Sequence, residues 1–63
     1  MIDLGEIKAC MARNGHTQKD IAAILELSIN SVNLKIQGKR EFTVQELATL
    51  AKNYDVEISL FIK

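Results

Sequence analysis

Apolar residues recur at the three- and four-residue spacing of helices, and each series begins beside a residue that caps helices. Asp3 and Glu6 have the spacing of a capping box, and a helical apolar series follows until Gly15. Thr17 and Asp20 repeat this start more weakly before a second series of isoleucine, alanine and leucine. The pattern therefore predicts two helices between residues 4 and 26.

Two further helices follow by the same rules. Ser28 is the candidate N-cap of the third helix, and Gly38 ends it. Thr43 and Glu46 form the clearest capping box in the chain, and Leu47, Leu50, Ala51 and Tyr54 follow at helical spacing. The predicted fold class is all-α, a compact bundle of four or five short helices.

The tail, residues 56–63, fits two interpretations. Alternate positions are apolar, as in a half-buried strand, whereas Ile58, Phe61 and Ile62 also fit one face of a short helix. We favour a short fifth helix, because a lone strand would need a second chain as its pairing partner. So many large apolar groups must pack on the core or on a second copy. We expect a homodimer interface formed by Tyr54, Ile58, Leu60, Phe61 and Ile62.

The length of 63 residues fits a single domain over residues 1–63. The one cysteine excludes an intramolecular disulfide, and no Cys/His cluster suggests zinc. The longest apolar run, from Ile21 to Leu25, is far below the roughly 20 residues of a membrane span. The N-terminus lacks a secretory signal. We expect a cytoplasmic protein with no cofactor, no metal, no membrane partner and no small-molecule ligand.

Candidates for catalysis are scarce. Cys10 and His16 are the only unusual nucleophile or base candidates, and their six-residue separation places them on opposite sides of a continued helix. We interpret Cys10 as a small buried side chain and His16 as a solvated turn residue. The sequence contains no glycine-rich phosphate loop, zinc-protease motif or paired carboxylates, so we do not expect an enzyme.

The net charge is zero, but the charges are unevenly distributed. From Lys8 to Arg40 there are six basic and two acidic residues, a net of +4, and the ends carry the balancing −4. A neutral domain of this kind can present a basic face to a polyanion, although chance alone also scatters charges unevenly.

The segment from Thr17 to Gly38 describes a helix-turn-helix unit, with helices at about residues 18–26 and 29–37. Ala22 is small where two steeply crossing helices must approach closely, and Val32 packs the second helix on the first. The alternative is a generic helical hairpin in a small bundle. The coincidence of these features with the basic pair Lys39 and Arg40 favours DNA binding.

These residues resemble the Cro and phage-repressor type of helix-turn-helix regulators, also called the lambda-repressor-like or xenobiotic-response-element family. The matching stretches are Thr17-Gln18-x-Asp20-Ile21-Ala22, Leu25-x-Leu27-Ser28, Ser31-Val32, Lys35-Ile36-x-Gly38-Lys39 and Phe42-Thr43-x-x-Glu46-Leu47. The similarity extends from Leu4 to about Phe61. It implies four or five helices, with the third in the major groove of DNA.

Three positions depart from the family pattern. Glu26 occupies the turn where the family usually has glycine. Lys35 stands where many members have an apolar residue, and we expect Ile36 to take over the core position. Glu57 replaces the serine or threonine that often caps the last helix, which weakens the helical interpretation of the tail.

Helical geometry assigns the faces of the third helix. With Val32 toward the core, steps of about 100° per residue turn Asn30, Asn33, Leu34 and Gln37 outward. Amide side chains can pair bidentately with adenine, and an apolar side chain can meet a thymine methyl group. Ile29 fits either the groove or the core.

Other residues are expected to contact phosphates. Gln18 lies in the first turn of the second helix, where free backbone N–H groups and the helix dipole favour an anion. Lys39 and Arg40 follow the third helix, and Lys35 fits the same role. The residues predicted to meet DNA are Gln18, Ser28, Ile29, Asn30, Asn33, Leu34, Lys35, Gln37, Lys39 and Arg40.

Two functions remain open. The first is a sequence-specific DNA-binding regulator, a homodimer that binds double-stranded DNA at a pseudo-palindromic operator with half-sites about 34–36 Å apart. The second is an antitoxin-like or anti-repressor protein-interaction module on the same fold. The amide-rich face and the Lys39-Arg40 pair favour the first, whereas the neutral charge and the apolar tail slightly favour the second.

Overall fold

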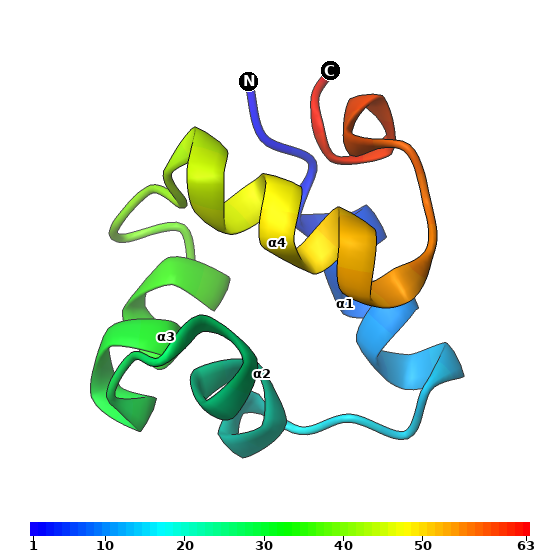
Figure 1. Ribbon diagram of the computed structural model, residues 1–63. Helices are drawn as coiled ribbons and strands as arrows, with labels where there is room; N and C mark the ends of the chain where they lie inside the picture. The colour runs from blue at the N-terminus through cyan, green and yellow to red at the C-terminus, as the bar shows by residue number, and fades with distance from the viewer.

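The computed structural model describes all residues, 1–63, and is all-helical (Figure 1). Its elements are α1 (Leu4–Arg13), α2 (Gln18–Leu25), α3 (Ile29–Ile36), α4 (Val44–Tyr54) and the 3-10 helix η1 (Ile58–Phe61). The predicted fold class, an all-α bundle with a helix-turn-helix, is confirmed. No helix has the length and apolar character needed to cross a bilayer.

The helices begin where their capping residues predict. The side chain of Asp3 accepts a hydrogen bond from the backbone N–H of Glu6 (3.2 Å). At the start of α4, the Thr43 hydroxyl accepts from the Glu46 N–H (3.1 Å), and the Glu46 carboxylate accepts from the Thr43 N–H (2.9 Å). Each bond satisfies an N–H group that has no partner within the helix. Local rules therefore place the helix starts.

One core holds the helices together. It consists of twelve buried apolar residues drawn from every helix and from the segment before α4, namely Ile7, Cys10, Met11, Ile21, Ala22, Val32, Ile36, Phe42, Leu47, Leu50, Ala51 and Phe61. Helix α2 packs against both α3 and α4, while η1 packs on α1 and α4. Burial of apolar surface is the main stabilising term in a domain that has no disulfide.

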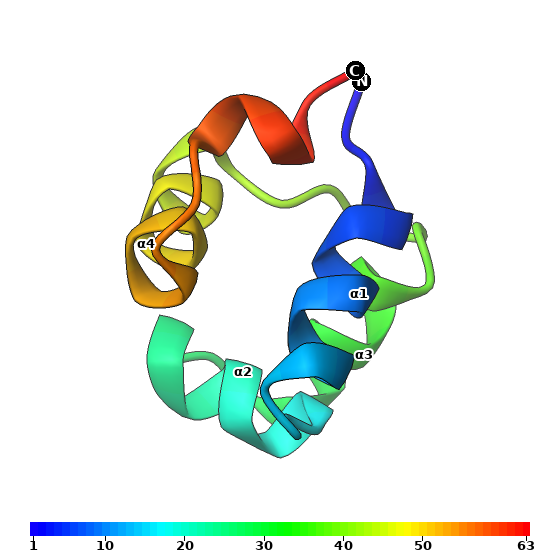
Figure 2. The same cartoon turned by 90° about the vertical axis from the view of Figure 1, so that its right-hand side faces the viewer.

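The tail returns to the N-terminus, and Figure 2 shows η1 bridging the upper ends of α4 and α1 with the two chain ends side by side. The favoured short fifth helix is confirmed, in 3-10 form. Strand-like pairing is confined to one antiparallel bridge between Ile2 and Ile62. The tail therefore pairs with the N-terminus of its own chain and needs no second chain. The Asp3 N–H donates to the Phe61 carbonyl (2.7 Å).

The assignment of Phe61 to a dimer interface is wrong. Its side chain is fully buried in the core of its own chain, with 0% exposed. The 3-10 helix η1 packs against α1 and α4, and Phe61 is its buried residue. Leu60 and Ile62 stay partly exposed, at 38% and 44%. Leu60 and Ile62 thus remain open to a second copy, and the half-buried Ile58 and Tyr54 remain so in part.

Candidate nucleic-acid interface

The turn between α2 and α3 is tight, and Glu26 forms it. This residue ends α2 in the left-handed conformation, with φ 56° and ψ 44°. That conformation is easiest for glycine, so a glutamate carries a modest steric cost there. The next N–H, of Leu27, donates to the carbonyl of Ala22 (2.9 Å) and closes the helix end. Two residues later α3 begins, and Ser28 caps it by accepting from the Ser31 N–H (3.1 Å).

Helix α3 turns one face to the core and another to solvent. Val32 and Ile36 are buried, at 0% and 7% exposed, as the sequence predicts. Asn30 is exposed, and Ile29, left open between core and groove, is 51% exposed and therefore faces outward. The outward face thus combines amide and apolar groups.

The other residues expected on this face differ in exposure. Gln37 is exposed, whereas Asn33 and Leu34 are half-buried. The Gln37 side-chain amide donates to the Asn33 side-chain oxygen (2.9 Å), across one helical turn. This bond links the two amides at the C-terminal end of α3.

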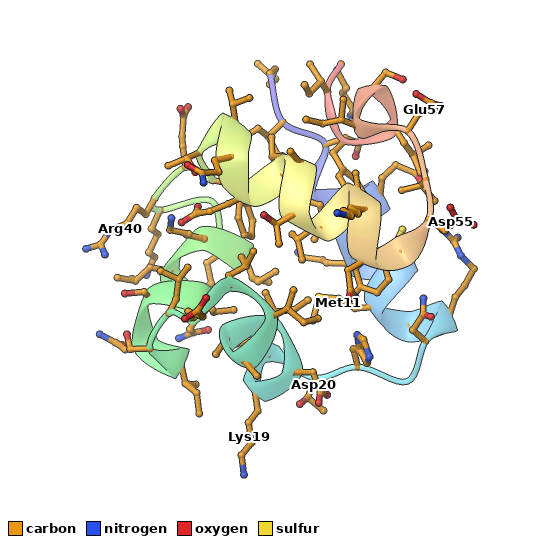
Figure 3. All side chains as sticks on the ribbon, in the orientation of Figure 1. Met11, Lys19, Asp20, Arg40, Asp55 and Glu57 are labelled. Atoms are coloured by element: carbon orange, nitrogen blue, oxygen red, sulfur yellow. The ribbon has the colours of Figure 1, made fainter.

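Basic side chains lie beside α3. Lys39 and Arg40 are exposed in the segment 37–43, directly after the helix, and Gln18 is half-buried in the first turn of α2. In Figure 3, Arg40 projects away from the body beyond α3 and Lys19 projects from α2, so that α3 lies between the two side chains in this view. Lys19, a weaker candidate for a phosphate contact by its sequence position beside Gln18, is exposed.

A family profile described as Helix-turn-helix matches residues 7–61. The chain belongs to this helix-turn-helix family, of the Cro and repressor type. It therefore carries a DNA-binding helix-turn-helix, as expected of a transcription regulator. Comparison with curated proteins and with solved structures gives no match.

Within this helix-turn-helix fold, Lys35 does not lie where a phosphate contact needs it. Only 6% of the residue is exposed, and its ammonium pairs with the carboxylate of Glu46 on α4. The ammonium also lies 5.8 Å from the centroid of the Phe42 ring. Position 35 falls three residues after Val32, so it shares the core side of α3 with Ile36. A buried charge requires a partner, and Glu46 supplies it. The prediction that Lys35 contacts DNA is therefore wrong.

Glu46 is ionised under ordinary conditions. Partial burial disfavours the charged carboxylate and alone would raise its pKa. Hydrogen bonds from the Lys35 ammonium and the Thr43 backbone, together with the charge of Lys35, outweigh burial and hold the pKa of Glu46 below its ordinary value of 4.5. One carboxylate thus caps α4 and binds α3.

The two catalytic candidates serve the fold of this helix-turn-helix domain. Cys10 is buried at 1% exposed, as expected. The interpretation of His16 as a solvated residue is wrong, because it is half-buried and its Nδ1 lies 2.8 Å from the Tyr54 hydroxyl. Burial raises the pKa of that tyrosine. The contact ties the loop between α1 and α2 to the end of α4.

Proposed function

We propose that the protein is a sequence-specific DNA-binding transcriptional regulator of the phage or bacterial Cro and repressor type, acting in the cytoplasm. In this proposal α3, at about residues 28–37, reads the major groove. The observation that carries it is the solvent-facing side of α3, where Ile29, Asn30 and Gln37 are exposed opposite a buried side.

The chemistry of this side suits base edges. The major groove admits a helix, and its base pairs present distinct donor and acceptor patterns together with the thymine methyl group. Asn30 and Gln37 offer paired donors and acceptors that suit adenine, and Ile29 offers an apolar contact for thymine. The bonded Asn33 and Gln37 amides need less ordering on binding than free side chains would.

The flanking groups suit phosphates. Lys39 and Arg40 lie just beyond α3, and Gln18 lies at the N-terminal end of α2, where unpaired N–H groups and the helix dipole favour anions. Such contacts fix the position of the protein on the duplex without carrying sequence information.

Two alanine variants separate these roles. Asn30→Ala is expected to lose about 1–3 kcal/mol of binding to a specific duplex, with little change on a scrambled one, because a base edge carries sequence. Lys39→Ala is expected to weaken both alike and to lower the slope of log K against log salt by about 1, because a phosphate carries only charge. Titrations at several salt concentrations measure both effects.

Asn53→Ala and Lys52→Ala on α4 are the matched controls, since both residues are exposed on another helix. An equal loss on both duplexes with a reduced slope for Asn30→Ala would mean that α3 is oriented differently. Unchanged binding in both α3-side variants would favour the protein-interaction module.

We also propose that the regulator is a homodimer on a pseudo-palindromic operator, with half-sites about 34–36 Å apart. Support comes from Leu60 and Ile62, which remain 38% and 44% exposed although their neighbour Phe61 is buried. The half-buried Ile58 and Tyr54 flank the same tail. A two-fold contact would cover each of these side chains twice, once in each copy.

The double variant Leu60→Ser/Ile62→Ser is expected to weaken dimerisation about 100-fold, because each lost apolar contact counts twice in a symmetric interface. Sedimentation equilibrium measures the association constant of the dimer. The control is Val44→Ser, which removes a 72% exposed apolar side chain from the start of α4. A folded double variant with an unchanged association constant would exclude this interface.

A further inference from the structure

The segment that joins α3 to α4, residues 37–43, is tied down at both ends. After α3, the N–H groups of Lys39 and Arg40 both donate to the carbonyl of Leu34, at 2.9 and 3.3 Å. Before α4, Phe42 is buried at 4% exposed. The two basic side chains themselves remain exposed between these anchors. The backbone of the basic pair is therefore ordered before any ligand arrives.

A cluster of Lys35, Phe42 and Glu46 joins the two anchors. The Lys35 ammonium, near the end of α3, lies over the ring of Phe42 and pairs with Glu46 in the first turn of α4. The same oxygen of Glu46 accepts from the Thr43 N–H, at the end of the segment. Backbone packing of α3 is mainly against α2, so this side-chain cluster is a direct tie between α3 and α4.

We infer that the Lys35–Phe42–Glu46 cluster positions the exposed pair Lys39 and Arg40 relative to α3 for binding to DNA phosphates. Lys35 is a positioning residue in this role and touches no DNA. The inference rests on the proposed function, because it concerns how the base-reading face of α3 and the phosphate-binding pair Lys39 and Arg40 are kept in a fixed relative position. Without the tie, the end of the segment at Phe42 and Thr43 is no longer linked to α3 and must be ordered on binding, which reduces affinity while leaving the number of phosphate contacts unchanged.

Lys35→Met tests the role with the fold kept intact. Methionine keeps an unbranched side chain at this buried position but removes the ammonium. Removal of one partner of a buried ion pair leaves the other charge uncompensated and has a stability cost. The cost is smaller here than for loss of Glu46, because the Glu46 side chain is 17% exposed against 8% for Lys35 and keeps its capping bond to Thr43. The variant is expected to stay folded, with exchange of the Lys39 amide proton about 10-fold faster in the free protein.

On a duplex selected from a random pool, Lys35→Met is expected to lose about 5- to 10-fold in affinity with an unchanged salt slope. The charge-neutral variant Lys35→Met/Glu46→Gln should lose a similar factor, because glutamine can still cap α4 and the net charge is that of the wild type. Lys52→Met makes the same chemical change at an exposed position of α4 and should leave amide exchange at Lys39 unchanged.

Three results would overturn the inference. A salt slope reduced by about 1 in Lys35→Met would make Lys35 itself a phosphate ligand. Unchanged affinity in both cluster variants would make the cluster purely structural, and unchanged exchange at Lys39 would show that it does not anchor the segment. If the wild type binds no DNA, the proposed function fails, whereas the exchange measurement still decides whether the cluster orders the segment.

Discussion

Replacing Phe61 by alanine is expected to lower the free energy of unfolding by about 3–5 kcal/mol. The side chain is fully buried against α1 and α4, so truncation removes a large apolar contact and leaves a cavity. A domain of 63 residues has only a few kcal/mol of stability in total, so the variant should be largely unfolded at 37 °C. Urea denaturation followed by circular dichroism measures the change.

The control is Ile62→Ala, one residue further along and 44% exposed. Its expected loss is about 1 kcal/mol or less. Similar losses at both positions would mean that the tail does not fold back on its own chain. The result also decides how dimerisation can be tested, since deletion of the tail would remove part of the core.

Glu46→Ala is expected to destabilise the protein by about 3–5 kcal/mol, because it leaves the buried ammonium of Lys35 without its carboxylate. The substitution also removes the cap of α4. Adding Lys35→Met should recover most of the loss, since no unpaired charge then remains buried. Chemical denaturation of the two single variants and the double variant gives the coupling between the residues.

Glu41→Ala is the matched control for Glu46→Ala, because it removes a carboxylate of the same connecting region from an exposed site. Its expected effect is within about 0.5 kcal/mol. Failure of Lys35→Met to rescue Glu46→Ala would show that the cost is the lost cap and not the orphaned charge.

The lowered pKa of Glu46 gives this pair a defined pH dependence. Its stabilisation is fully present above the ordinary value of 4.5 and is lost as pH falls through the lower pKa of the folded state.

Local rules predicted the helices well, because capping residues and apolar spacing act within a few positions of the chain. Thr43 with Glu46 is an example, in which both bonds of the capping box form as expected. The outward position of Asn30 and the buried position of Val32 also follow from helical geometry alone. These two predictions required only one assumption, that Val32 points toward the core.

The predictions that failed depended on contacts between distant residues. The ion-pair partner of Lys35 lies eleven positions away along the chain. From its own position alone, Lys35 is predicted to be another basic residue near the groove. His16 meets Tyr54 across 38 positions, and Phe61 reaches a core built by earlier helices. Periodicity cannot show which side of a short terminal helix the rest of the chain will cover.

The ratio of dissociation constants for selected and scrambled DNA decides whether α3 reads base sequence. Duplexes enriched from a random pool by the full protein are titrated beside scrambled duplexes of equal length at physiological salt. We predict a Kd at least about 1,000-fold lower for the selected duplex, and a smaller ratio for Asn30→Ala. Equal Kd values for the two duplexes would mean that α3 does not read base sequence.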